Sequence, residues 1–144
     1  MTGVTTVSGS TLIAVFETES TGLFSIASIT STDDGKSWSG RKTIYTPPSP
    51  YASAGAPQII NVGGTLVVSF QTNEDEALDR PAGNYLDGSV AKLVTSGDGG
   101  GAWGDKIAVG GVVSVWPGLV VLDAGSLLVL FDEGGAKGQV VGLN

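Results

Sequence analysis

The chain has 144 residues, a formal net charge of −7 and neither cysteine nor histidine. This length suits one domain of ordinary size, and the 23 glycines with many small residues are typical of an all-β chain with many turns. Without cysteine or histidine, disulfides, thiolate or histidine metal sites and Ser-His-Asp catalysis are excluded, and the acidic balance disfavours nucleic acid and anionic membranes as partners.

The first predicted unit contains four short strands in succession. Residues 3–7, 11–16, 23–30 and 42–45 carry strand patterns, with turns or polar residues between them. The second of these strands ends in Leu-Ile-Ala-Val-Phe, which is apolar on both faces and predicts a strand covered on both sides. We expect this strand to end at Glu17. A proline-rich connection at 46–50 leads to the next unit.

The same order of strands then returns. Residues 57–62, 65–70, 89–95 and 106–109 are predicted as the strands of a second unit, with a long polar loop at 72–88. A third unit begins at Trp116-Pro117, with predicted strands at 119–122, 126–131 and 139–143. The second strands of the three units end alike, in Phe16-Glu17, Phe70-Gln71 and Phe131-Asp132.

An eight-residue motif follows the third strand of the first two units. Ser31-Thr32-Asp33-Asp34-Gly35-Lys36-Ser37-Trp38 and Ser96-Gly97-Asp98-Gly99-Gly100-Gly101-Ala102-Trp103 both read Ser-x-Asp-x-Gly-x-x-Trp, and we call them the first and the second Asp-turn. Serine and aspartate side chains bond the backbone after them and glycine permits a positive φ, so each motif predicts a tight turn packed down by its tryptophan. A motif that repeats with its surroundings indicates a repeat fold.

Four-stranded antiparallel units that are apolar on both faces are typical of the blades of a β-propeller. We predict an all-β, single-domain partial β-propeller of about two and three-quarter blades, at residues 3–50, 55–111 and 112–144. A β-sandwich or jelly roll is the alternative, although its strands more often alternate between apolar and polar residues. With so few blades, the outer faces of the first and last are predicted to be uncovered. The chain is then a fragment of a longer protein, or its copies self-associate through the open blade faces.

These motifs resemble those of a known superfamily. The Asp-turns resemble the Asp-box, or BNR repeat, of sialidase-like propellers. A wider frame resembles the C-terminal half of fungal exo-1,5-α-L-arabinanases, which are six-bladed propellers and retaining glycoside hydrolases. The matching segments are Val15-Phe16-Glu17, Gly55-Ala56-Pro57-Gln58, Leu66-Val67-Val68-Ser69-Phe70, Glu74-Asp75 and Trp116-Pro117-Gly118-Leu119. The resemblance covers nearly the whole chain, and implies a carbohydrate substrate and a secreted parent protein, although the N-terminus carries no signal-peptide pattern. We expect no cofactor and no metal.

Strand direction sorts the predicted residues onto two ends of the blades. The Asp-turns share one end, and we interpret their residues as structural: Ser31, Asp33, Gly35, Trp38, Ser96, Asp98, Gly100 and Trp103. The other end carries Glu17, the loop at 72–88, Asp132 and Trp116, so we expect any chemistry there. Retaining glycoside hydrolysis needs an acid/base and a nucleophile, two carboxyl groups about 5–5.5 Å apart.

By resemblance, Glu17 is the acid/base and Glu74 is the nucleophile. A solvated loop of like charge is the alternative interpretation of Glu74, and Asp132 or Glu133 is the reserve choice. Trp116, beside a proline, predicts either a sugar-stacking platform or packing between blades. The other predicted substrate-binding residues are Gln58, Asp132 and Tyr85.

The predicted function is that of a segment of a retaining, exo-acting glycoside hydrolase for a neutral polysaccharide such as arabinan. A sialidase is disfavoured because the sequence contains only Arg41 and Arg80, too few for the arginine triad that holds a sialic acid carboxylate. A non-catalytic propeller segment that binds glycan or protein is the alternative, supported by Gln71 where the other two units have a carboxylate.

Overall fold

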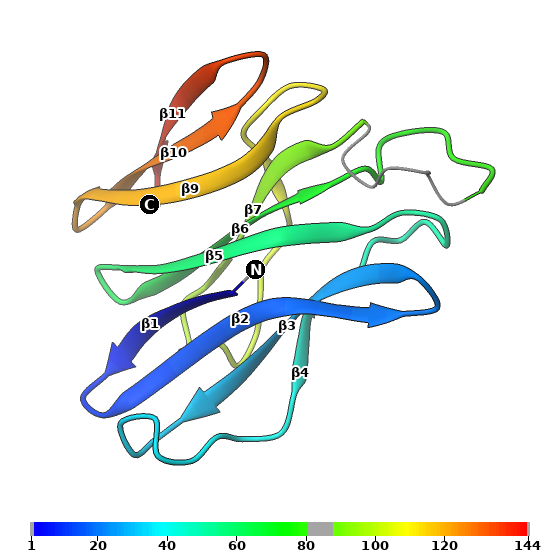
Figure 1. The fold of residues 1–144 in the computed structure, drawn as a ribbon. Coiled ribbons are helices and arrows are strands. Elements are labelled where there is room, and N and C mark those ends of the chain that lie inside the picture. The colour runs from blue at the N-terminus through cyan, green and yellow to red at the C-terminus, as the bar shows by residue number, and fades with distance from the viewer. Residues whose placement is uncertain (1, 81–87, 144) are drawn as a thin grey trace.

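The computed structural model describes residues 2–80 and 88–143, and its strands form three antiparallel sheets (Figure 1). In spatial order the first sheet runs β1-β2-β3-β4, the second β5-β6-β7-β8 and the third β9-β10-β11. The strands are β1 Thr2–Ser8, β2 Thr11–Ser20, β3 Leu23–Ser31, β4 Lys42–Tyr45, β5 Ala54–Val62, β6 Thr65–Thr72, β7 Val90–Ser96, β8 Ile107–Ala108, β9 Val115–Asp123, β10 Ser126–Asp132 and β11 Ala136–Gly142. Among the described residues there is no helix, and so none that could cross a bilayer.

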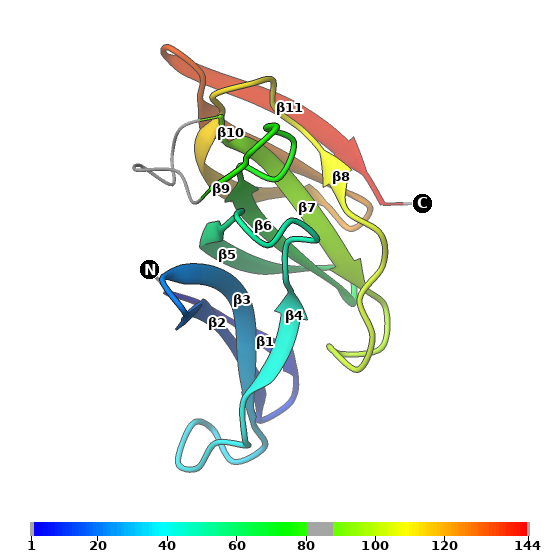
Figure 2. The ribbon, with the colours of Figure 1, turned by 90° about the vertical axis from the view of Figure 1, so that its right-hand side faces the viewer.

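The three sheets are stacked with their first strands next to one another. β1 and β9 each contact β5, while β4 and β8 lie on the outer side of their sheets (Figure 2). The approach at the inner side is close, because a Cβ atom on Gly3 would lie 3.1 Å from the backbone nitrogen of Ile59. The side chain of Asn61 also donates to the carbonyl oxygens of Thr6 and Val7, at 3.0 and 3.1 Å. Sheets stacked through their first strands are propeller blades, which confirms the predicted all-β partial propeller.

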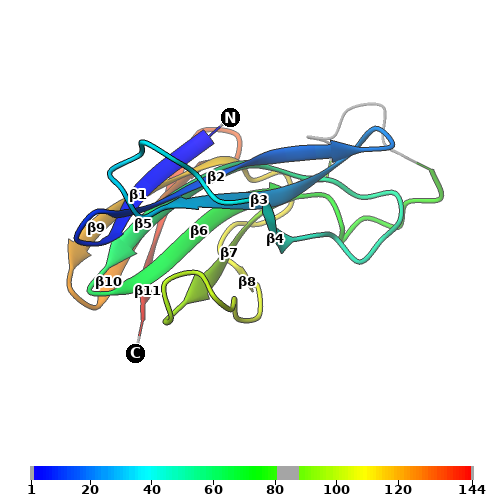
Figure 3. The ribbon, with the colours of Figure 1, turned by 90° about the horizontal axis from the view of Figure 1, so that it is seen from below.

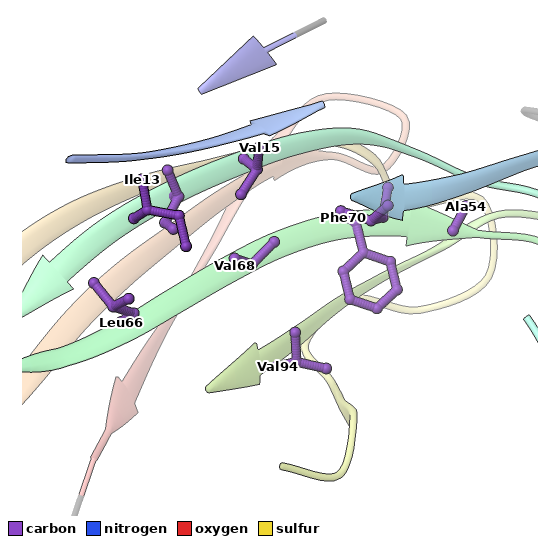
Figure 4. Packing of buried hydrophobic residues seen from close by; sticks show 9 residues of the cluster. Ile13, Val15, Ala54, Leu66, Val68, Phe70 and Val94 are labelled. Atoms are coloured by element: carbon purple, nitrogen blue, oxygen red, sulfur yellow. The ribbon is translucent and has the colours of Figure 1, made fainter. Parts of the chain in front are cut away.

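Two apolar clusters fill the spaces between the sheets. In β6, Leu66, Val68 and Phe70 pack into the first cluster, against Ile13 and Val15 of β2 (Figure 4). The intervening residue Val67 belongs instead to the second cluster, on the side of the third sheet, together with Leu127, Val129 and Phe131 of β10. Alternate residues of a strand point to opposite faces, so a central blade needs a second strand that is apolar on both sides.

The second strand of the first sheet is longer than predicted. The expectation that it ends at Glu17 is wrong, because β2 continues to Ser20 and pairs with β3 up to Leu23. Thr21 and Gly22 both have positive φ, at 57° and 80°, as a two-residue hairpin turn requires. Glu17 therefore lies within this hairpin, and on the second strand of its blade rather than on the innermost strand, β1.

β5 and β9 begin earlier than predicted, at Ala54 and Val115. Their register slips near Ala56 and Trp116, which have φ of 52° and 56°. A bulge of this kind inserts an extra residue that sequence periodicity does not reveal.

The connections lie at two opposite ends of the sheets, as predicted. The β1–β2 turn and the β2–β3 turn lie at opposite ends in Figure 3. The first Asp-turn is beside the β1–β2 turn, since Asp34 N donates to the carbonyl oxygen of Ser10 at 3.1 Å. At the other end, Ser53 N donates to the Asn73 side chain at 2.9 Å, which joins the connection before β5 to the loop after β6. We call the two ends the Asp-turn end and the loop end.

Candidate functional site

The polar side chains of the first Asp-turn are bonded within the turn. Ser31 Oγ donates to Asp33 Oδ1 at 2.8 Å and accepts from Gly35 N at 2.9 Å. The backbone N and the hydroxyl of Ser37 donate to the same carboxylate, at 2.8 and 2.6 Å. These hydrogen bonds, led by that of the Ser37 hydroxyl, lower the pKa of Asp33 to about 2.

The second Asp-turn repeats this arrangement. Ser96 Oγ donates to Asp98 at 2.7 Å and accepts from Gly100 N at 2.9 Å, and Ala102 N donates to Asp98 at 2.9 Å. The hydrogen bond from Ala102 N is the largest of the contributions that hold the pKa of Asp98 below its ordinary value. Both aspartates close their own turns, which supports the structural interpretation of these residues.

The two tryptophans of the Asp-turns have different surroundings. Trp103 packs against the first apolar cluster, between the first and second sheets. Trp38 is 40% exposed, and its indole N–H donates to the Gly35 carbonyl oxygen at 3.2 Å. Trp103 packs toward the blade that precedes its own, and no blade precedes the first sheet in this chain.

Glu74 follows β6 at the loop end and is the centre of a cluster of charges. Its side chain is only 2% exposed, and both Lys92 Nζ and Lys106 Nζ lie 2.7 Å from its Oε1. The hydroxyl of Tyr45, at the end of β4, donates to its other oxygen. Lys92 also pairs with Asp75 at 2.7 Å. We call these five residues the Glu74 cluster; its two lysines balance its two carboxylates.

The cluster fixes the protonation of Glu74 and Tyr45. Burial alone would raise the pKa of Glu74, but the hydrogen bonds from Lys106, Lys92 and Tyr45 outweigh it and hold this pKa below its ordinary value. Burial, together with the hydrogen bond and negative charge of Glu74, raises the pKa of Tyr45 far above its ordinary value. Glu74 is therefore a carboxylate and Tyr45 a neutral phenol at neutral pH.

The sequence reasoning did not identify Tyr45, Lys92 and Lys106. Lys92 did carry a signal, because it stands in the apolar strand Val90–Ser96 and is almost fully buried. A lysine in such a place needs an opposite charge within reach. Tyr45 carried no comparable signal, since its contact with Glu74 joins two different blades.

Glu17 has another kind of partner. Its Oε1 accepts a hydrogen bond of 2.6 Å from Ala56 N, at the bulge of β5. Gln71, one blade further on, does the same for the third sheet, with Oε1 accepting from Trp116 N at 2.8 Å. The two residues that donate these bonds, Ala56 and Trp116, both have positive φ and precede a proline. We call this repeated contact the bulge contact.

Glu17 and Glu74 thus lie at the same end of the chain's blades but in different surroundings. Glu17 contacts the first strand of the following blade, whereas Glu74 contacts Tyr45 in the fourth strand of the preceding one. Within the described residues, no hydrogen bond or ion pair joins the two carboxylates. Their assignment as a catalytic pair stays a prediction.

Trp116 is 46% exposed and lines an open hollow on the third sheet at the loop end, together with Gly118, Leu130, Phe131, Asp132 and Ala136. Asp132 is exposed at the end of β10 and accepts from Gly135 N at 3.0 Å. Gln58 is half-buried on β5, beside Gly3 of β1. The prediction for Tyr85 lies outside the described residues.

No family model matches the chain, and neither does any curated protein. Solved structures do. An α-L-arabinanase of Penicillium chrysogenum has a TM-score of 0.61 and 17% identity over 91% of this chain and 45% of its own. A family 117 glycoside hydrolase of Zobellia galactanivorans has a TM-score of 0.66 and 14% identity, and the match covers 96% of this chain and 50% of that one. A Hadza microbial sialidase has a TM-score of 0.65 and 17% identity, and the match covers 96% of this chain and 34% of that one. The chain therefore shares the β-propeller fold of these structures, and spans between a third and a half of their lengths.

Proposed function

We propose that this chain is a segment of a retaining, exo-acting glycoside hydrolase that cleaves a neutral polysaccharide such as arabinan, outside the cell that makes it. The observation that carries this proposal is the propeller fold, which the chain shares over nine-tenths of its length with enzymes named for hydrolysis of arabinan and other glycans. The predicted acid/base is Glu17 and the predicted nucleophile is Glu74.

The ionised state of Glu74 supports its role as the nucleophile. A glycosidase nucleophile must be ionised, and two lysines and a phenol keep Glu74 ionised despite its burial. The same partners also enclose it. In this proposal the sugar reaches Glu74 only when the more exposed Lys106, whose side chain is 36% exposed, moves away.

The arginines support a neutral substrate. Arg41 donates to the hydroxyl of Thr18 at 2.6 Å, and the only other arginine, Arg80, is in the long loop. A planar carboxylate is best held by several guanidinium groups together, and this chain has too few. The part of the pocket that this segment supplies therefore fits a neutral sugar better than a sialic acid.

The test is hydrolysis of linear α-1,5-arabino-oligosaccharides by the enzyme that contains this segment, followed by chromatography of the products. We expect release from one end only, lost in Glu17→Gln and in Glu74→Gln. Glu19→Gln is the matched control, because Glu19 is an exposed glutamate on the same strand as Glu17. Full activity in Glu17→Gln would remove Glu17 from the mechanism, and full activity in Glu74→Gln would do the same for Glu74.

A second function, glycan binding without catalysis, is favoured by the bulge contact. Gln71 makes the same bond as Glu17 although it has no charge, so this bond alone does not explain why position 17 is a glutamate. Binding of the oligosaccharides without any hydrolysis, lost in Trp116→Ala, would favour this second function over the first. The absence of both hydrolysis and binding would overturn both proposed functions.

A further inference from the structure

Each sheet presents one face to the sheet before it and one to the sheet after it. The residues that follow one another along the second strands alternate between these faces. We call them the preceding face and the following face. Phe70 and Val68 of β6 belong to the preceding face of the second sheet, and Val67 and Gln71 to its following face.

The two internal interfaces are built from matching rows of side chains. Ile59, Val68 and Val94 are opposite one another across β5, β6 and β7, and form a row on the preceding face that is buried in the first cluster. Ile60 and Val67 are paired on the following face and pack in the second cluster. An apolar row covered by the next sheet is thus the repeating contact of this fold.

The third sheet carries the same row on its following face, but uncovered. Val120, Leu128 and Val140 are directly opposite one another across β9, β10 and β11. Val120 is 47% exposed and Val140 is 63% exposed, and Leu130 on the same face of β10 is 45% exposed. Asp132 is at the position that Glu17 and Gln71 have in the other two sheets, where these two residues make the bulge contact.

The first sheet carries the complementary row on its preceding face, also uncovered. Val4, Ala14 and Ile29 are opposite one another across β1, β2 and β3, at the positions that Ile59, Val68 and Val94 have in the second sheet. Val4 is 59% exposed. Phe16, which corresponds to the fully buried Phe70, is only half-buried, and Trp38 is exposed on the same sheet.

We propose that these two open faces bind each other between two copies of this chain, head to tail. Each copy has one following face and one preceding face of the kind that already pack together twice within it, so the contact continues an interface that the chain itself displays. Two copies use all four faces if the arrangement closes, and closed assemblies are what heterologous contacts form when their rotation allows it. The chain spans 45% and 50% of two of the matched enzymes, so two copies approach the length of one.

The pairing also completes the hollow beside Trp116. Leu130 and Asp132 line this hollow and belong to the open following face. The second copy's first sheet then supplies the wall that is missing, so the loop end of the assembly is lined by both copies. This inference concerns the 144-residue chain by itself. Its tests measure mass rather than hydrolysis, so its failure is distinguishable from a failure of the proposed function.

The first experiment is sedimentation velocity of the purified chain across a range of protein concentrations. We expect a single species of twice the 14.5 kDa of one chain. A folded monomer at every concentration overturns the proposal. A series of larger species that grows with concentration also overturns it, because it shows that the contact does not close.

Variants then test the orientation. Leu130→Glu damages only the following face and Val4→Glu only the preceding face, so each is expected to give monomers. Val140→Glu repeats the first test at a more exposed position, where a charge is least able to disturb folding. Ile107→Glu is the matched control, because Ile107 is 48% exposed but lies on the edge strand β8, and it is expected to stay dimeric.

The last experiment mixes the two variants. An equimolar mixture of the Leu130→Glu and Val4→Glu variants keeps one undamaged pair of faces, so mixed dimers are expected. Circular dichroism on the same samples shows that both variants are folded. If Leu130→Glu is monomeric while Val4→Glu remains a dimer, the copies pair through one face only and the head-to-tail arrangement is overturned.

Discussion

Lys92 is the more buried of the two lysines that bind the carboxylate of Glu74. Its side chain is 5% exposed and binds both Glu74 and Asp75, whereas Lys106 reaches Glu74 from the surface. Removing one partner of a buried ion pair leaves an uncompensated charge, which costs far more than the pair itself contributes. The same loss at a partly exposed pair is reduced by water.

We therefore expect Lys92→Met to lower the free energy of unfolding by about 3 kcal/mol at pH 7, the lower end of the range for a broken buried pair, because Lys106 and Tyr45 still contact Glu74. Lys106→Met is the matched control and is expected to cost clearly less. Urea unfolding followed by circular dichroism, at one fixed protein concentration, measures both. Equal losses in the two variants would contradict the ranking of the two lysines.

The pH dependence of Lys92→Met has a definite sign. Because the pKa of Glu74 is lower in the folded protein than its ordinary value of 4.5, Glu74 stabilises the fold above that pH, and this contribution is lost on acidification. Without Lys92 the depression is smaller. The difference in stability between the variant and the parent should therefore shrink as the pH falls below 4.5, and an unchanged difference would contradict this account.

The first Asp-turn allows a second test by pH. Three donors converge on the Asp33 carboxylate, and an asparagine offers a single acceptor oxygen. The pKa of Asp33 is about 2 in the fold against an ordinary 3.8, so its stabilising contribution is present above pH 3.8 and lost as the pH falls towards 2.

We expect Asp33→Asn to be less stable than the parent at pH 7, by an amount that disappears near pH 2. Thermal unfolding across this pH range measures it. Asp105→Asn, at an exposed aspartate outside both Asp-turns, is the control for the loss of one surface charge. A constant deficit in Asp33→Asn would mean that the turn needs the side chain only for its shape.

The sequence predicted the side-chain contacts that are local along the chain and missed those that join different blades. The Asp-turn bonds join residues two to four positions apart, so the motif itself contained them. The Glu74 cluster joins Tyr45 in one blade to Lys92 and Glu74 in the next, and such a contact depends on how the blades stack. No pattern in a single sequence predicts that stacking closely enough to pair these side chains.

Among the secondary-structure elements, the bulges at the start of β5 and β9 depend on the second strand of the blade before them. Ala56 and Trp116 have positive φ, which costs a non-glycine residue of order 1–3 kcal/mol and persists only where the surroundings enforce it. The side chains of Glu17 and Gln71 enforce it by accepting from the backbone N–H at each bulge. The second strand of one blade thereby shapes the first strand of the next.

This gives a prediction that separates geometry from charge at Glu17. Glu17→Gln should change the free energy of unfolding by no more than about 1 kcal/mol, because Gln71 shows that an amide oxygen makes the same contact. Glu17→Ala leaves the buried Ala56 N–H without its partner and should cost about 1–3 kcal/mol. Urea unfolding measures both, and equal costs would show that the contact carries no stability.

The extents of the strands show where periodicity was sufficient. It placed β4 correctly at 42–45, and it placed β1, β3, β6, β7, β8 and β10 with small differences at their ends. It missed the first residues of β5, β9 and β11. It failed at 17–20, because Glu-Thr-Glu-Ser has no apolar face and yet pairs fully with β3. A polar hairpin beyond the core is held by backbone pairing and by its Thr-Gly turn, which apolar alternation does not detect.

On the scale of the whole molecule, the stacking that buries one side of each terminal sheet leaves its other side apolar and open. The chain also carries a net charge of −7, so two copies that approach each other repel. The rows that would meet, Val4-Ala14-Ile29 and Val120-Leu128-Val140, contain no charged residue. Attraction between the copies is therefore hydrophobic, while the opposing term is the electrostatic repulsion of the two whole chains.

Salt should consequently tighten the head-to-tail dimer. The screening length falls from about 30 Å at 0.01 M ionic strength to about 10 Å at 0.1 M, so the repulsion weakens while burial of the apolar rows is unaffected. We expect the dissociation constant measured by sedimentation equilibrium to fall as sodium chloride is raised across this range. Ile107→Glu should show the same trend with a weaker dimer at low salt, because it adds a negative charge outside the interface. A dissociation constant that rises with salt would mean that ion pairs, and not the apolar faces, hold the copies together.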